Sequence, residues 1–288
     1  MKRLLLATSL LFAFGGAYAG PFYLNVEQNF DGQVAPAGDK ECDTCTSMKD
    51  EFLFTYESIT TIQDSDASGT ISAGDALSTD GGLAVGGLEN NLITGFTPED
   101  VFGANSSNGY GNDWLLTFSV EDLQGQITGV TDGGVPLFTY DPGTIEMFLT
   151  FDGSTLIHFM DVAVTGGGAT GVSTVLTGNA DFTNVADLTY ANLFHSGEFE
   201  CNGSSGFYDI WNECGAGAGD ALEIGFVSSF DTNIFVSDFD FDPDTGLFSL
   251  SSNHDGSATF TIPEPSALAL LGGGLVLLGL FGARRRMS

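Results

Sequence analysis

Short apolar and β-branched runs alternate with turn residues through most of the chain. In its middle part, five runs follow one another at residues 114–120, 125–128, 135–140, 145–151 and 155–164. The last third continues with runs at residues 222–228, 234–241, 246–251 and 258–262. Turn residues such as Asp152-Gly153 separate the runs, and Asp-Gly between two apolar runs is a strong hairpin signal. The pattern predicts a body of antiparallel strands.

Helical periodicity is scarce in the body, with short helices expected only near residues 98–102 and 184–193. We therefore expect an all-β fold, an antiparallel sandwich or jelly roll with two packed layers. Residues 238–242 alternate Asp with Phe, which predicts a strand that buries its Phe face before a turn closed by Gly246. Residues 166–168 are three consecutive glycines, which we expect in a loop.

The N-terminus has the features of a secretion signal. Lys2 and Arg3 precede an apolar run at residues 4–14, and Ala17-Tyr18-Ala19 is the small-x-small pattern that signal peptidase accepts. We expect residues 1–19 to form a signal helix that is removed on export. The mature body then begins at Gly20.

The C-terminus combines three features. Pro263-Glu264-Pro265 precedes an uncharged stretch rich in Leu and Gly, and the stretch ends at Arg284-Arg285-Arg286. A helix over residues 266–283 would rise about 27 Å, close to the roughly 30 Å of a hydrocarbon core, so we expect a transmembrane helix. Arginines are costly to translocate, which keeps this end in the cytoplasm and the body outside. A permanent single-pass anchor is the simplest interpretation.

The order of these parts resembles the PEP-CTERM sorting signal of Gram-negative exported proteins. The resemblance covers residues 263–288 and implies processing by exosortase, a membrane transpeptidase-like enzyme often encoded near exopolysaccharide genes. It also implies that Pro263, Glu264 and Pro265 mark the recognition site and that the tail is removed. Proteins of very different function share this tail, floc-forming and biofilm-matrix proteins among them.

The body between the two ends is strongly acidic. Residues 20–262 hold 37 of the chain's 38 acidic residues and only Lys40 and Lys49 as basic ones, which gives this stretch a net charge of −35. Such a field repels nucleic acid and anionic lipid, and it favours solubility and cation binding. A nucleic-acid partner is excluded. The stretch is long and apolar enough to bury a core, so we expect it to be folded.

Four cysteines remain after export, at Cys42, Cys45, Cys201 and Cys214. An oxidising compartment favours disulfides, for which four cysteines allow three connectivities. We favour the local pairs Cys42 with Cys45 and Cys201 with Cys214. Cys-x-x-Cys is also found in zinc and redox sites, but the second pair lacks metal-ligand spacing and no helix pattern follows Cys45.

The sharpest local motif is residues 64–75, DSDASGTISAGD. It fits the calcium-loop pattern, in which oxygen ligands at alternating positions wrap a hard cation and Gly69 permits the bend. The motif resembles EF-hand and dockerin-type loops, although a strand-like segment at 52–62 precedes it and an Asp replaces the usual final Glu. An ordinary polar turn is the alternative. The predicted Ca²⁺ ligands are Asp64, Asp66, Ser68, Thr70 and Asp75.

Other chemistry is thinly represented. The Asp cluster at residues 238–244 is a weaker cation candidate, which the strand and turn already explain. The three histidines, His158, His195 and His254, accompany no nucleophile elbow and no metalloprotease motif, and we expect His195, among acids, on the surface. No catalytic residue is therefore assigned.

These observations favour a non-enzymatic protein of the cell surface or the biofilm or floc matrix, delivered by exosortase and stiffened by calcium and disulfides. The second hypothesis is an exopolysaccharide-binding β-sandwich. It would need an exposed aromatic platform, for which Trp114, Tyr208 and Trp211 are the candidates. An extracellular hydrolase, which would need two close carboxylates in a cleft, ranks third.

Overall fold

The computed structural model describes residues 20–36, 40–99, 105–169, 171, 173–219, 222–231 and 234–262. The signal residues 1–19 and the tail 263–288 lie outside these ranges, and with them the predicted signal helix, transmembrane helix and sorting residues. Within the described ranges, every helix is too short or too polar to cross a membrane.

The described residues are mostly strand. The strands are β1 (Phe22–Leu24), β2 (Glu51–Gln63), β3 (Ala76–Gly82), β4 (Leu92–Thr97), β5 (Leu115–Val130), β6 (Pro136–Tyr140), β7 (Gly143–Thr150), β8 (Ile157–Ala169), β9 (Ser173–Asp181), β10 (Phe194–Ser196), β11 (Gly225–Asp231), β12 (Asp240–Asp242) and β13 (Leu247–Thr261). The helix α1 spans Phe207–Cys214, and short 3-10 turns are η2 (Leu88–Asn90), η3 (Leu188–Tyr190), η4 (Ala216–Ala218) and η5 (Val236–Asp238). The prediction of an antiparallel, mostly β body is confirmed.

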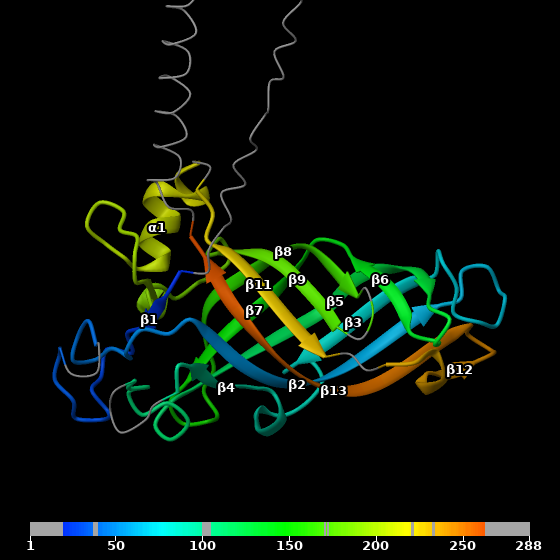
Figure 1. Ribbon diagram of the computed structural model, residues 1–288, viewed down its shortest axis with the longest axis horizontal. Coiled ribbons are helices and arrows are strands. Elements are labelled where there is room, and N and C mark those ends of the chain that lie inside the picture. Colours follow the sequence, from blue (N-terminus) through cyan, green and yellow to red (C-terminus); the bar gives the residue numbers. More distant parts are fainter. Residues whose placement is uncertain are drawn as a thin grey trace, which may run out of the picture. The chain divides into compact units, whose positions relative to one another are not determined.

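The main sheet closes on itself (Figure 1). Its strands follow one another in the order β2, β3, β5, β6 with β7, β8, β9, β11 and β13. The last strand, β13, pairs with the first, β2, from Leu247 opposite Gln63 to Ala258 opposite Phe52. β6 and β7 both lie between β5 and β8, so they act as one strand interrupted at Asp141-Pro142. The two expected layers are thus the two sides of one continuous closed sheet.

The interior of this closed sheet is filled by aromatic side chains. In β2 every second residue from Phe52 to Ile62 is buried, as expected for a strand with one face inward. Tyr56 packs against Phe118 and Phe230, with ring centroids 5.5 and 5.7 Å apart. Aromatic rings bury large areas each, so these contacts dominate the stability of the body.

A second aromatic group lies at the end of the closed sheet that carries β1, β10 and α1. Phe207, the first residue of α1, is fully buried with its ring centroid 5.0 Å from Phe260 of β13 and 5.8 Å from Phe194 of β10. Ile210 is buried on the same face of α1. The helix therefore closes this end of the interior; β12 lies at the opposite end (Figure 1).

Two local expectations are wrong. Gly166, Gly167 and Gly168 form part of β8 rather than a loop, with φ of 155°, 148° and 152°. A Cβ on Gly167 would lie 2.3 Å from the Val175 carbonyl oxygen, and one on Gly168 would lie 2.0 Å from that of Phe138. Gly167 and Gly168 are needed because β9 and β6, respectively, approach β8 too closely for a side chain at these two positions.

The alternating segment 238–242 is the other correction. Asp238 ends η5, and β12 comprises only Asp240–Asp242, all of them exposed. Its Phe241 is 40 % exposed and stacks on Phe248 of β13 at 4.4 Å instead of entering the core. The turn that follows is as expected, since the Gly246 amide donates to the Asp242 carbonyl at 2.8 Å.

Two short helices were predicted in the body, and the described residues fully cover only the one at 184–193. The segment at 184–193 contains only η3, and 98–102 lies partly outside the described residues. α1 was not anticipated.

Candidate functional site

The predicted calcium loop connects β2 to β3. Asp64 follows the last residue of β2 and Asp75 precedes the first residue of β3, so the pairing of these strands brings the loop ends together. Carboxylate oxygens of Asp64, Asp66 and Asp75 lie within 4.8 Å of one another. Asp64 and Asp75 are 9 % and 1 % exposed, whereas Asp66 is exposed.

Loop amides point at the first two carboxylates. Asp64 accepts hydrogen bonds from the amides of Ser68 at 3.0 Å and Gly69 at 2.7 Å. Gly69 has φ of 71°, the bend that the pattern requires. Hydrogen bonds from Ser68 lower the pKa of the Asp66 carboxyl, so this exposed acid stays charged.

The remaining candidates lie nearby. Asp75 accepts from the amides of Ser65 at 2.9 Å and Ser72 at 2.7 Å. The Ser68 hydroxyl donates to the Thr70 carbonyl, the oxygen that the pattern assigns to the cation, at 3.0 Å. Carboxylate oxygens have more than one lone pair, so they can accept an N–H and a cation together. The donor set consists of oxygens, the ligands that Ca²⁺ takes.

The second Asp cluster is occupied with backbone contacts. Asp238 accepts from the Phe235 amide at 2.8 Å, and Asp242 accepts from the Asp244 amide at 2.9 Å. The Asp244 amide holds the pKa of the Asp242 carboxyl below its usual value. These carboxylates stabilise a 3-10 turn and a hairpin turn.

Both cysteine pairs form the local disulfides that the sequence favoured. Cys42 is bonded to Cys45 and Cys201 to Cys214. Cys214 is the last residue of α1, so its bond ties the helix to the loop that begins at Cys201.

The aromatic candidates do not form one platform. Trp114 is 1 % exposed, and its Nε1 donates to the Asn108 carbonyl at 2.8 Å, which corrects the expectation of an exposed ring. Tyr208 and Trp211 stack on α1 with centroids 6.2 Å apart. A Cβ on Gly217 would lie 2.7 Å from the Trp211 ring, so the η4 turn covers that ring.

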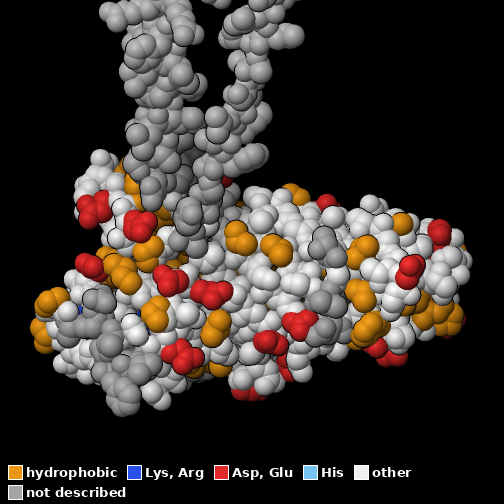
Figure 2. Space-filling view, in the orientation of Figure 1, with side chains coloured by type: hydrophobic (Ala, Val, Ile, Leu, Met, Phe, Trp, Pro, Cys, Tyr) orange, Lys and Arg blue, Asp and Glu red, His pale blue; other side chains and the backbone are white. Residues whose placement is uncertain are grey.

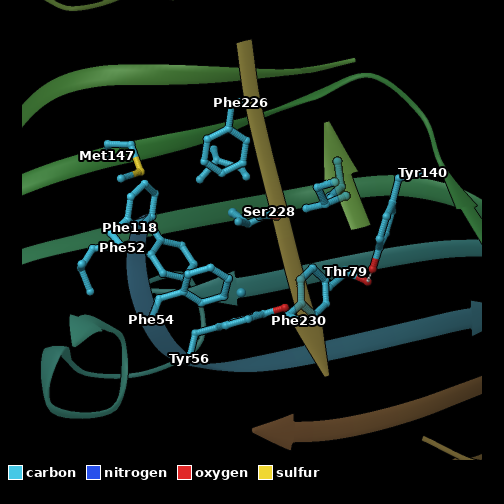
Figure 3. A pocket seen from close by; sticks show the side chains of 16 residues that line it. Phe52, Phe54, Tyr56, Thr79, Phe118, Tyr140, Met147, Phe226, Ser228 and Phe230 are labelled. Atoms are coloured by element: carbon cyan, nitrogen blue, oxygen red, sulfur yellow. Dashed lines mark hydrogen bonds between the residues drawn. The ribbon is translucent and has the colours of Figure 1, made fainter. Parts of the chain in front are cut away.

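The interior of the closed sheet holds a small cavity of about 50 Å³, bordered by aromatic rings and Met147 (Figure 3). Thr79 Oγ1 is 3.1 Å from both Thr60 Oγ1 and Tyr140 Oη at its polar side. Burial raises the pKa of Tyr140 to about 12, so its hydroxyl stays neutral. A cavity known to bind benzene has a volume of roughly 150 Å³, so this one is too small for a sugar ring.

His254 belongs to a second interior polar group that sequence analysis missed. Its Nε2 is 2.8 Å from the hydroxyls of Ser58 and Ser252, and its Nδ1 is 3.0 Å from the Asp231 carbonyl oxygen. Burial lowers the pKa of His254. The imidazole is therefore a neutral, fully hydrogen-bonded part of the core.

His195 is not simply a surface residue among acids. Its ring stacks on Tyr23 with centroids 4.8 Å apart, and Nδ1 is 3.1 Å from the Ser205 hydroxyl. Burial lowers the pKa of His195.

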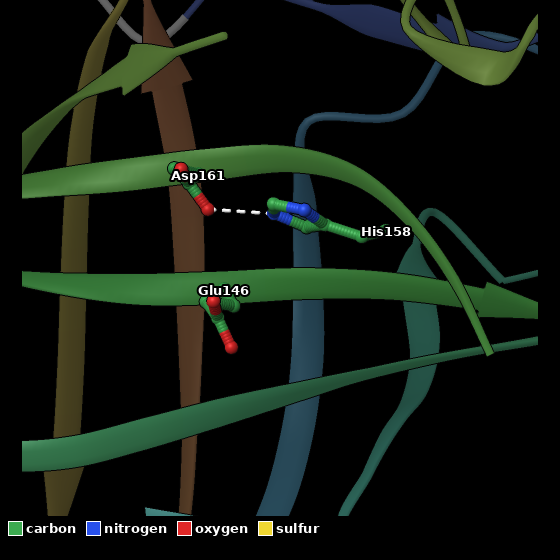
Figure 4. A group of neighbouring side chains, drawn as sticks. All are labelled: Glu146, His158 and Asp161. Atoms are coloured by element: carbon green, nitrogen blue, oxygen red, sulfur yellow. Dashed lines mark hydrogen bonds and ion pairs between the residues drawn. The ribbon is translucent and has the colours of Figure 1, made fainter. Parts of the chain in front are cut away.

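His158 lies in a different kind of cluster, shown in Figure 4. Its Nε2 is 2.7 Å from Asp161 Oδ1, and ligand atoms of Glu146, His158 and Asp161 all lie within 4.8 Å of one another. Glu146 comes from β7 and the other two from β8. Sequence spacing gives no sign of this cluster, because residues three apart on a regular strand face opposite sides.

The described chain is thus a disulfide-bonded, acidic body with a closed antiparallel sheet. Residues 261–286 match the PEP-CTERM protein-sorting motif, as the C-terminal resemblance predicted. This motif implies export to the surface or the extracellular space, with exosortase as the processing partner. No curated protein and no solved structure matches the chain.

Proposed function

We propose that the body is a non-enzymatic protein of the cell surface or of the biofilm or floc matrix. The observation that carries this proposal is the PEP-CTERM motif at residues 261–286. Pro263, Glu264 and Pro265 are the proposed recognition site. The tail up to Arg284, Arg285 and Arg286 holds the protein in the membrane as an intermediate until exosortase removes it. Signal peptidase removes residues 1–19.

The build of the body supports a structural role. Aromatic rings fill its interior, and the described cavity is too small for a sugar ring. Acidic side chains are spread over the face seen in Figure 2, and residues 20–262 carry a net charge of −35. A surface of this charge attracts divalent cations, which also cross-link anionic matrix polymers.

Calcium is part of the proposal. The carboxylates of Asp64, Asp66 and Asp75 are the proposed anchors, with the oxygens of Ser68 and Thr70 completing the set. The support is the convergence of three carboxylates within 4.8 Å in a loop with calcium-loop spacing. The bound ion would fix the hairpin between β2 and β3.

A groove on the body favours exopolysaccharide binding as the second candidate. It has a volume of about 600 Å³, and the apolar side chains of Leu53, Phe54 and Phe230 line it together with hydroxyl and carboxylate groups, among them those of Ser173, Ser229, Asp231, Asp255 and Ser257. Such groups are the hydrogen-bonding partners that sugars use. Co-sedimentation with the host's exopolysaccharide, for wild type and for Ser229→Ala with Asp255→Ala, measures this activity.

The main proposal is tested by deleting the gene and scoring floc formation, biofilm mass and cell-surface protein. We expect the deletion strain to lose matrix. The wild-type gene should restore it, whereas a variant lacking residues 263–288 should not. Unchanged floc and biofilm in the deletion strain would contradict the matrix role. Unchanged matrix with the truncated variant would contradict only the sorting step.

A further inference from the structure

We propose that Glu146, His158 and Asp161 form a binding site for a divalent transition-metal ion, Zn²⁺ in the first instance, on the outer face of the closed sheet. This site is separate from the calcium loop and independent of the proposed matrix role.

An irregularity in strand pairing creates the site. Met147 lies opposite Met160, but the next residue of β7, Phe148, lies opposite His158, so β8 contains Phe159 as an extra residue. Such a bulge re-aims the side chains on either side of it. As a result His158 and Asp161 face the same side, and their side chains meet at 2.7 Å (Figure 4).

The side of the sheet follows from the neighbours of Glu146. Ile145 and Met147 border the interior cavity, so Glu146 between them points outward. Asp161 lies directly opposite Glu146 in the register and shares its face. Glu146 is exposed and free to adjust its rotamer, whereas Asp161 is 2 % exposed and fixed.

The ligand types select the class of metal. One imidazole nitrogen with two carboxylates is a set that Zn²⁺ and similar first-row ions accept, whereas Ca²⁺ takes oxygen ligands. Three protein ligands also leave a coordination position for water. The calcium loop, whose donors are all oxygens, does not compete for the same ion.

Charge along the strands points independently to a bound cation. Asp161 lies opposite Glu146 on one side and opposite Asp181 of β9 on the other, so three acids follow one another across three neighbouring strands. Like charges directly opposite one another destabilise a sheet, and a buried carboxylate is normally paired or bound to metal.

Lysine side chains do not offset this charge, and His158, itself one of the proposed ligands, is the basic group that contacts Asp161. The only lysines in residues 20–262 contact other groups, Lys40 the carboxylate of Asp31 and Lys49 the carbonyls of Pro98 and Asn105. A divalent ion between Glu146 and Asp161 removes the repulsion.

Titration calorimetry with ZnCl₂ tests the proposal on protein purified from the host and stripped with chelator, in calcium-containing buffer that saturates the loop. We expect one zinc site in wild type and an affinity at least about tenfold lower in Glu146→Gln and in His158→Ala. Glu121→Gln, which removes another exposed acid from the neighbouring strand β5, is the matched control and should bind as wild type does. Co²⁺ should give d–d absorption bands that His158→Ala loses.

Absence of a zinc site in wild type would overturn the proposal and leave the cluster as an ion pair between His158 and Asp161. Equal affinities in wild type and Glu146→Gln would also overturn it, since zinc would then bind elsewhere. Because Glu146 is exposed, its variant is expected to fold, and the conclusion does not depend on His158→Ala alone.

Discussion

His254 of β13 lies directly opposite Tyr56 of β2, at the pair of strands that closes the sheet, and the two ring centroids are 4.8 Å apart. The Asp231 carbonyl only accepts hydrogen bonds, so Nδ1 carries the proton and Nε2 accepts from a hydroxyl of Ser58 or Ser252. The closing strands are thus joined by a neutral imidazole as well as by backbone hydrogen bonds.

This arrangement makes stability depend on pH. Burial lowers the pKa of His254 and of His195 from the ordinary value of 6.5. At acidic pH the unfolded chain therefore binds protons that the folded chain does not bind. The contribution of the two neutral histidines to the free energy of unfolding is fully present above pH 6.5. It is lost as the pH falls through their lowered pKa values. Urea unfolding between pH 7 and about 5 separates this effect from carboxylates, which titrate near 4. We expect a shallower slope for His254→Gln; an unchanged slope would contradict the assignment.

Calcium should raise the thermal stability of the body through the loop at residues 64–75. At a calcium concentration a hundred times the dissociation constant, one site adds about 2.7 kcal/mol, because the ion binds the folded state alone. Melts with calcium and with matched magnesium separate binding from general screening of the acidic surface. Asp64→Ala combined with Asp66→Ala should abolish the calcium-specific shift. Equal shifts in both proteins, or with both ions, would mean that the loop is only a turn.

Gly168→Ala should destabilise the body by about 3 kcal/mol. Its Cβ would collide with the Phe138 carbonyl oxygen, and φ of 152° is strained for any L-residue. Gly129→Ala is the control within β5, since a Cβ there meets no atom within 4 Å. Denaturant unfolding of the two variants gives the comparison, and equal stabilities would contradict the close approach of β6 to β8.

The processed protein should begin at Gly20 and lack Arg284, Arg285 and Arg286. The motive is the signal pattern at one end and the sorting motif at residues 261–286 at the other. Intact-mass measurement on surface-exposed protein from the native host gives both termini at once. Recovery of the arginines on that form would indicate a permanent anchor.

Alternation predicted strands best where most of the inward residues are apolar. β2 lies where expected because Phe52, Phe54, Tyr56 and Ile62 mark its inward face, although the buried Ser58 and Thr60 between them are polar. β13 was divided into two runs because Ser252 and His254 face inward and interrupt the apolar series that marks a buried face. The strand continues through them because their side chains are satisfied by one another and by Ser58.

The two candidate metal sites also differ in how far the sequence alone could reveal them. The calcium loop is local in sequence, so its spacing could be recognised, and the structure places its three aspartates together. The cluster of Glu146, His158 and Asp161 depends on a bulge and on the register of two strands. Trp114 was a candidate for an exposed ring and is buried, because nothing in its sequence neighbourhood reveals that the ring is enclosed.

Closure of the sheet by β2 and β13 also governs how copies of this protein meet. A strand whose backbone groups lack neighbours is a template for growth into fibres, and a closed sheet removes such templates. Among the described residues, the strands outside the ring are short, such as β4 and the three-residue β12. At high density outside the cell, we therefore expect copies to contact one another through side chains and bound ions. Such contacts dissociate with salt or chelator, whereas backbone-paired fibres would not.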